Sequence, residues 1–134
     1  MPKQLPQPEE YSPFAKLVGW NFTKLEDGHS QCILEVNENH LNVIKRVHGG
    51  VVYSLADVGM AGAVSTYLEE DEVPATIEVK INYFLPATSG VLTCESRTIH
   101  ISGKLAVAES EIENEGRLIA KAIGTFHRTK RTET

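Results

Sequence analysis

Apolar and polar residues alternate strictly in one stretch of the chain. Between Thr76 and Tyr83 the odd-numbered residues are apolar and the even-numbered ones are polar. A period of two residues is typical of a half-buried β-strand, which we predict over residues 76–86. Three more strand-like stretches follow, bounded by Gly, Pro and Asn residues. They cover residues 91–102, 105–113 and 117–128.

The first part of the chain also has strand character. Residues 20–26 and 30–36 favour two strands, and Asp27-Gly28 between them predicts a hairpin turn. Before them, Ser12 followed by proline is typical of a helix N-terminus, so we expect a short helix over residues 12–18.

The segment from Gly49 to about Glu69 has a different pattern, because it is apolar on nearly every side. A helix of this kind is buried, and in a small domain it has to lie across or inside a curved sheet. The short turns between the last four strands predict an antiparallel meander. The expected fold class is α+β, with one antiparallel sheet wrapped around one long buried helix.

Length and composition narrow the class of protein. The 134 residues predict a single domain over 1–134, with loose termini at 1–11 and 129–134. With 41% apolar and 23% charged residues, the composition is that of an ordinary globular protein. The only two cysteines, Cys32 and Cys94, stand in strand-like segments and fit small core residues.

Charge and hydropathy bear on partners and location. No apolar run reaches the roughly 18 residues of a membrane span, so we expect no membrane partner. The N-terminus lacks the apolar region of a signal peptide, which favours a cytoplasmic protein. The net charge of −5 argues against nucleic acid as a partner, and the histidine spacing predicts no metal site.

Gly49 and Gly50 stand where the buried helix is expected to begin. Without Cβ atoms they let a ligand approach the backbone closely. Their N–H groups are among the donors that a helix N-terminus leaves unpaired. Together with the helix dipole, these donors favour binding of a carbonyl oxygen or a developing oxyanion. The alternative is that the glycines only let the start of the helix pack closely.

Asp57 stands in the middle of the same helix, with apolar residues at 55, 56 and 58. A carboxylate is rarely buried unless it is paired or functional, and burial raises its pKa. Such a group is suited to act as a general base or a nucleophile. The alternative is that Asp57 lies on the rim of the helix, in water or beside a surface cation.

The spacing of Gly49 and Asp57 has a consequence for the quaternary structure. Eight residues separate them, or about 12 Å at the helical rise of 1.5 Å per residue. Reacting atoms must come within about 3–3.5 Å of each other. If both residues act on one carbonyl, Asp57 has to come from a second copy of the chain. This predicts an obligate dimer with two identical sites.

Taken together, several motifs resemble the PaaI-like branch of the hot-dog fold acyl-CoA thioesterases. They are Asn42, the triplet His48-Gly49-Gly50, Asp57, the strand 76–86, Gly103-Lys104 and the closing residues 123–126. The resemblance covers about residues 15–128. It implies the hot-dog fold, hydrolysis of an acyl-CoA thioester to a carboxylate and free CoA, and a homo-oligomer that is a dimer or a dimer of dimers (a homotetramer). It implies no cofactor beyond the coenzyme A of the substrate.

The resemblance also implies a role for each residue of the site. The backbone N–H of Gly49 would polarise the thioester carbonyl, and Asn42 would help to place that carbonyl or a water. His48 would orient the turn through a hydrogen bond. Asp57 of the partner subunit would act as general base on water or as nucleophile. Thr76 would assist the water.

Further residues are candidates for substrate binding, the basic ones as ligands of the CoA phosphates. They are Gly50, Lys45, Arg46, Arg97, Lys104 and Arg128. Each of these charges is alternatively a solvated surface group.

Two other functions remain open on the same fold: a non-catalytic acyl-CoA-binding module, and a dehydratase or hydratase. Asp57 favours the thioesterase over the binding module. The long-helix motifs of the dehydratases are absent from the sequence.

Overall fold

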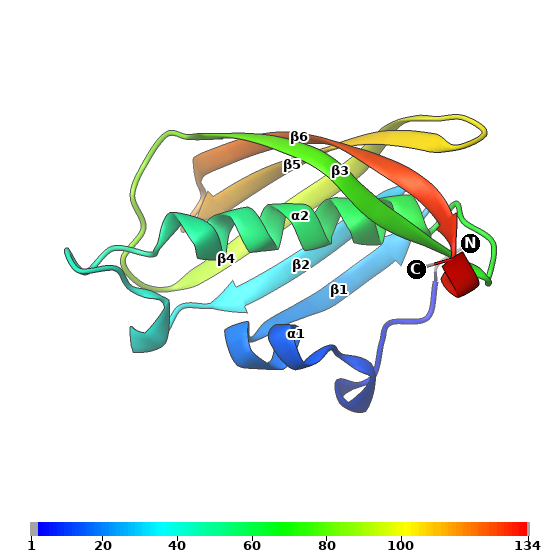
Figure 1. Cartoon of the computed structure of the whole chain (residues 1–134). Coiled ribbons are helices and arrows are strands. Elements are labelled where there is room, and N and C mark those ends of the chain that lie inside the picture. Colours follow the sequence, from blue (N-terminus) through cyan, green and yellow to red (C-terminus); the bar gives the residue numbers. More distant parts are fainter. Residues whose placement is uncertain (1–2, 134) are drawn as a thin grey trace.

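The structure is a computed structural model that describes residues 3–133, in which one sheet curves around one long helix (Figure 1). The helices are η1 (Pro8–Glu10), α1 (Pro13–Val18), η2 (Glu38–His40), α2 (Gly49–Ser65) and η3 (Arg131–Glu133). The strands are β1 (Trp20–Glu26), β2 (His29–Glu35), β3 (Glu72–Tyr83), β4 (Val91–Ile101), β5 (Leu105–Asn114) and β6 (Arg117–Lys130). The predicted α+β class is confirmed, and the arrangement is the hot-dog fold.

The sheet order is β1-β2-β4-β5-β6-β3, and every neighbouring pair is antiparallel. The predicted meander is therefore correct for β4, β5 and β6 but wrong for β3, which pairs with β6 at the edge of the sheet. The connection over residues 84–90 contains Pro86 and is too long for a two-residue hairpin turn. It lets β4 pair with β2 instead.

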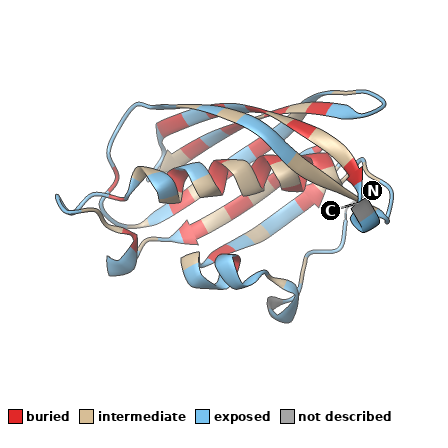
Figure 2. Ribbon diagram, viewed as in Figure 1, coloured by how far each residue is buried: buried red, intermediate tan, exposed pale blue. Residues whose placement is uncertain are grey.

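The hydrophobic core lies between α2 and the face of the sheet that it covers (Figure 2). Leu55, Ala56 and Met60 of the helix are at most 1% exposed, as are Leu34 and Phe126 of the sheet. The side of α2 that points away from the sheet is half-buried or exposed, although the nearly uniform apolar sequence predicts burial on every side.

Two hydroxyl groups of the sheet fix the rotation of α2 about its axis. Ser30 Oγ donates to the carbonyl of Gly59 at 2.6 Å, and Ser110 Oγ donates to that of Ala56 at 2.9 Å. With Ala56 and Gly59 held against the sheet, Asp57 is turned to the side of the helix. The position of the carboxylate is therefore a consequence of core packing.

The two cysteines lie opposite each other on β2 and β4 and are fully buried. Burial raises the pKa of the Cys94 thiol to about 11, and it raises the pKa of Cys32 as well. Both are core residues, as the sequence suggests.

Two element boundaries differ from the prediction. The helix α2 ends at Ser65 rather than near Glu69, because the hydroxyls of Ser65 and Thr66 donate to carbonyls one turn earlier and compete with the helical pattern. The strand β3 begins at Glu72, four residues before Thr76. It passes through a proline, which an edge strand tolerates.

The described parts of the termini, which the sequence predicts to be loose, make hydrogen bonds and an ion pair with the rest of the fold. The Lys3 N–H donates to the carbonyl of Leu25 at 2.6 Å. The strand β6 continues to Lys130, whose ammonium pairs with Asp71 at 3.1 Å. Residues 1–2 and 134 of the predicted loose ends lie outside the described residues. Across residues 3–133, no helix has the length and apolar character that crossing a membrane requires.

Candidate active site

His48 caps the N-terminus of α2. The side-chain Nδ1 of His48 accepts the backbone N–H of Gly50 at 2.8 Å. The backbone N–H of His48 donates to the carbonyl of His40 at 2.8 Å. The hydrogen bond expected of His48 at this turn is therefore present. The N–H of Gly50 is taken up by this cap, so it is not one of the unpaired donors that the sequence predicts for a ligand. The N–H of Gly49 meets no acceptor among residues 3–133 and is the donor left for a ligand.

Asn42 closes the loop that leads to α2. Its Oδ1 accepts the N–H groups of Ile44 at 3.0 Å and Arg46 at 3.1 Å. Since the carbonyl of the side chain holds the loop, the Nδ2 amide is the group that remains for a substrate. Asn42 is thus suited to donate a hydrogen bond to a carbonyl oxygen or to a water.

A cavity of about 330 Å³ lies beside Gly49, and we call it the Gly49 cavity. Asn42 and Arg46 give it polar groups, whereas most of its wall is apolar. The apolar side chains are Ile44, Val47, Val52, Phe84, Leu85, Pro86, Ala87 and Ile119. A site of this kind binds a largely apolar ligand and orients it through a few polar contacts.

Tyr83 packs directly against the start of α2. Its hydroxyl donates to the carbonyl of Gly49 at 2.8 Å, and its ring atoms lie 3.4 Å from the place where a Cβ of residue 49 would stand. Burial raises the pKa of Tyr83, which keeps the hydroxyl protonated as a donor. A Cβ at position 49 would be in ordinary van der Waals contact with this ring, so packing against Tyr83 does not require glycine there.

Asp57 is half-buried and accepts a hydrogen bond from Thr76 Oγ1 at 2.9 Å. The structure thus brings together two residues that the sequence resemblance placed in one site, from α2 and from β3. Burial raises the pKa of Asp57, and the hydrogen bond from Thr76 opposes that rise. The result is a carboxylate that accepts a proton more readily than an ordinary surface aspartate.

Within one chain, Asp57 and Gly49 do not meet. Both belong to α2, about 12 Å apart along its axis, and they line different cavities. The hydrogen-bond donors at Gly49 and the carboxylate of Asp57 therefore lie in two separate places. We call them half-sites, because the sequence predicts that they combine across a dimer.

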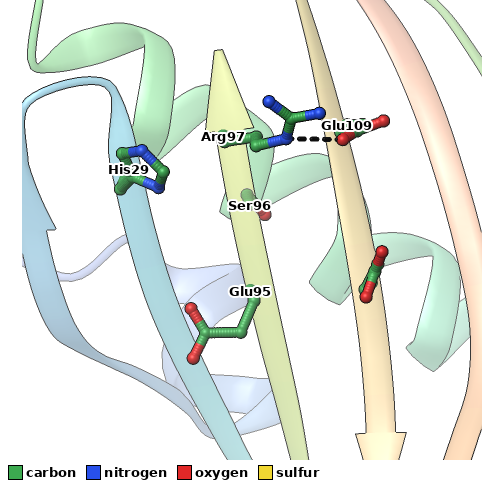
Figure 3. Close-up of a pocket in the computed structure, with 6 residues that line it drawn as sticks. His29, Glu95, Ser96, Arg97 and Glu109 are labelled. Atoms are coloured by element: carbon green, nitrogen blue, oxygen red, sulfur yellow. Dashed lines mark hydrogen bonds and ion pairs between the residues drawn. The ribbon is translucent and has the colours of Figure 1, made fainter. Parts of the chain in front are cut away.

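The structure does not place Arg97 near either half-site. Figure 3 shows it on the face of the sheet turned away from α2, beside Glu95 and His29. Arg97 Nε donates to Glu109 Oε1 at 2.6 Å. The acidic neighbours disfavour a phosphate at this place, and the prediction for Arg97 stays a prediction.

Arg128 is also occupied elsewhere. Its Nη2 pairs with Glu72 Oε1 at 3.0 Å, and its Nη1 donates to the carbonyl of Ser102 at 3.0 Å. The guanidinium ties β6 to the start of β3, and the prediction for Arg128 as a phosphate ligand stays a prediction. Lys104 lies nearby, in the turn between β4 and β5.

Lys45 and Arg46 are exposed in the loop before α2, and Arg46 borders the Gly49 cavity. The predictions for Lys45, Arg46 and Lys104 as phosphate ligands stay predictions.

Aromatic side chains lie beside Asp57, and two of them, Phe14 and Trp20, were not predicted from the sequence. Phe14, Trp20 and Tyr53 line a second cavity together with Asp57. Tyr53 stands four residues from both Gly49 and Asp57, and this helical spacing indicates a shared face. Phe14 and Trp20 reach α2 from distant parts of the sequence, so no local pattern reveals them.

Comparison with known proteins identifies the relatives of this chain. A family model described as the thioesterase superfamily matches residues 45–121. A candidate esterase of Saccharolobus solfataricus is 36% identical over 120 residues, which are 87% of this chain and 79% of that protein. A 1,4-dihydroxy-2-naphthoyl-CoA hydrolase of Listeria monocytogenes is 28% identical over 73% of this chain and 80% of that enzyme.

Two solved structures are similar over most of the chain. A conserved protein from Pseudomonas aeruginosa superposes with a TM-score of 0.88 and 33% identity, over 92% of this chain and all of that one. A mutant of the phenylacetic acid degradation protein PaaI from Thermus thermophilus superposes with a TM-score of 0.81 and 28% identity, over 88% of this chain and 100% of that one.

Proposed function

This chain belongs to the thioesterase superfamily and is a thioester hydrolase, and we propose that its substrates are acyl-CoA thioesters, which it cleaves to a carboxylate and free CoA. The observation that carries the proposal is the half-buried carboxylate of Asp57, with Thr76 at 2.9 Å and a raised pKa. The activity of the Listeria relative on a CoA thioester supports the same substrate class.

The proposed reaction needs an acceptor for a proton and donors for an oxyanion. Asp57 takes a proton from a water, which attacks the thioester carbonyl, and the N–H of Gly49 stabilises the negative charge that forms on the carbonyl oxygen. Collapse of the tetrahedral intermediate releases the CoA thiolate, which recovers the proton from Asp57. Direct attack by the Asp57 carboxylate is the alternative, and both routes need the ionised form.

We propose further that each site combines two subunits. The two half-sites of one chain are about 12 Å apart, too far to act on the same carbonyl. The free edge of β3 offers a surface for a second copy, because exposed edge strands with apolar side chains favour pairing. Ile77 is 56% exposed and Tyr83 is 51% exposed along this edge. The assembly is a dimer or a dimer of dimers.

A panel of acyl-CoA substrates, assayed by release of the free thiol, tests the proposed activity. We expect Asp57→Asn to lower kcat by about 10²- to 10⁴-fold, as expected for the loss of a general base, with unchanged circular dichroism. Asp71→Asn is the matched control, since Asp71 pairs with Lys130 in the region after α2.

Near-normal turnover by Asp57→Asn would refute the assigned role. Silence of the wild-type protein across short, long and aryl acyl groups, with CoA thioesters still bound, would favour the binding module instead.

A further inference from the structure

The cavity beside Asp57 has aromatic walls. It measures about 270 Å³ and lies between the N-terminal part of the chain and α2. Phe14 and Trp20 form one side, while Tyr53, Val58 and Ala61 of α2 belong to the other. We call it the aromatic cavity.

The polar groups of this wall are largely engaged within the protein. Ser12 Oγ accepts the N–H of Ala15 at 3.1 Å, where it caps α1. Ser54 Oγ donates to the carbonyl of Gly50 at 2.7 Å. Among the described residues of this wall, Asp57 is the one with a charged side chain. A ligand part that enters the cavity therefore meets apolar surface next to a reactive carboxylate.

The aromatic side chains are arranged for contact with a ligand. The rings of Phe14 and Trp20 pack edge to face, with centroids 5.6 Å apart. Trp20 is 7% exposed and forms the rigid base of this pair, whereas Phe14 is 52% exposed. A large apolar side chain at this level of exposure gains contact area when an apolar group binds beside it.

We infer that the aromatic cavity holds the acyl group of the substrate and that Phe14 and Trp20 determine which acyl groups are accepted. This inference rests on the proposed thioesterase activity. The carbonyl that Asp57 serves has to lie within reach of its carboxylate, so the first carbon of the acyl group begins at the cavity that Asp57 lines.

The two cavities divide the substrate between them. In a site shared by two subunits, the Gly49 cavity comes from one chain and the aromatic cavity from its partner. Arg46 at the border of the Gly49 cavity is a basic group that can pair with a CoA phosphate, so we assign the CoA portion to this side. The aromatic cavity suits the acyl portion.

Its volume sets the size of the acyl group. A cavity of about 150 Å³ holds benzene, so about 270 Å³ leaves room for a phenyl-bearing or medium-length group.

Variants of the wall test this assignment. Ala61→Phe fills the aromatic cavity from α2, and Phe14→Ala removes part of its opposite side. For phenylacetyl-CoA and hexanoyl-CoA, we expect Ala61→Phe to lower kcat/KM at least about tenfold, with a change below about twofold for acetyl-CoA. Phe14→Ala should act in the same direction. Leu17→Ala is the control, because Leu17 is an exposed residue of α1 outside the cavity wall.

A binding measurement separates this inference from the proposed activity. Trp20 is the single tryptophan of the chain, so intrinsic fluorescence reports directly on the cavity. We expect phenylacetyl-CoA to change the fluorescence of Asp57→Asn, which binds without turnover, and CoA alone to leave it unchanged. Ala61→Phe combined with Asp57→Asn should abolish the change.

The possible outcomes are distinct. A fluorescence response without hydrolysis of any thioester would support the acyl site and refute the enzyme. Hydrolysis of phenylacetyl-CoA without a response of Trp20, and with equal effects of Ala61→Phe on phenylacetyl-CoA and acetyl-CoA, would refute the acyl site and leave the enzyme intact.

Discussion

At the scale of single residues, the hydrogen bond between Thr76 and Asp57 decides how the carboxylate titrates. Burial raises the pKa of Asp57 and the bond from Thr76 lowers it, with burial the larger effect. The pKa of Asp57 therefore reflects two opposed effects, one that makes the carboxylate more basic and one that favours the ionised form that the reaction needs. A fully exposed aspartate would be a weaker base, and a fully buried one would stay protonated.

This balance predicts a pH profile. Only ionised Asp57 accepts a proton, so kcat/KM should rise with pH through a midpoint above the ordinary pKa of 3.8 for aspartate. Thr76→Val removes the hydrogen bond that lowers the pKa, so the midpoint should move to still higher pH. Initial rates across the acid range measure both. Thr93→Val is the control in another strand, and a midpoint unchanged by Thr76→Val would contradict the account.

Whether a charged side chain is free to bind a ligand or is held in an ion pair could not be predicted from the sequence. Asp57 and Gly49 belong to one helix, whose geometry makes their separation predictable. Arg128 is different, because its partner Glu72 lies 56 residues earlier and meets it only through the pairing of β3 with β6. An arginine free to bind phosphate and one held in an ion pair look the same in a sequence.

At the scale of elements, α2 packs so closely on the sheet that it leaves no room for a Cβ at Gly59. A Cβ there would stand 2.6 Å from Ser96 Oγ and 2.8 Å from Cys94 Sγ. Ser96 is held by a 2.7 Å hydrogen bond to Ser110, so it cannot move without loss of that contact. The glycine is required by packing, although glycine lowers helix propensity.

We expect Gly59→Ala to destabilise the protein by about 1–3 kcal/mol, the usual effect of overpacking a core. Urea denaturation monitored by circular dichroism measures the change. Gly103→Ala serves as the control, because a Cβ at Gly103 has no neighbour within 4 Å. A gain of the roughly 1 kcal/mol that alanine gives over glycine in an exposed helix would show that the packing is loose.

The elements themselves were largely predictable, and so were the pairings of β1 with β2, β4 with β5, and β5 with β6. The pairings of β3 with β6 and of β2 with β4 were not. Strict alternation over Thr76–Tyr83 indicates a strand whatever its neighbours are. Its place at the edge beside β6 depends on the path of residues 84–90, and periodicity carries no signal for that path. The same limit hid the aromatic cavity, since Phe14 and Trp20 reach α2 only through the folded arrangement.

At the scale of the whole molecule, the fold keeps Gly49 and Asp57 of one chain apart, as the proposed shared site requires. The distance between residues 49 and 57 is fixed because both lie on α2, and a helix does not bend enough to bring them to one atom. The proposed dimer makes use of this separation, since a two-fold axis turns two half-sites per chain into two complete sites per pair.

Mixing two inactive variants tests this arrangement. Asp57→Asn damages the carboxylate half. Asn42→Asp damages the donor half, because it replaces the free Nδ2 while keeping the Oδ1 that holds Ile44 and Arg46. In a mixed dimer, one site receives both changes and the other receives neither. Random exchange makes half of the dimers mixed, so the mixture should recover about one quarter of wild-type activity.

The measurement is thiol release after the two variants are unfolded together and refolded, with each variant refolded alone as the control. Each alone should stay at its low rate, because every site in its homodimer carries one of the two changes. A site built within one chain predicts no recovery at all, since each chain would keep its own defect. Recovery therefore depends on whether Asp57 serves the donors of its partner, which its distance from Gly49 along α2 requires if both act on one carbonyl.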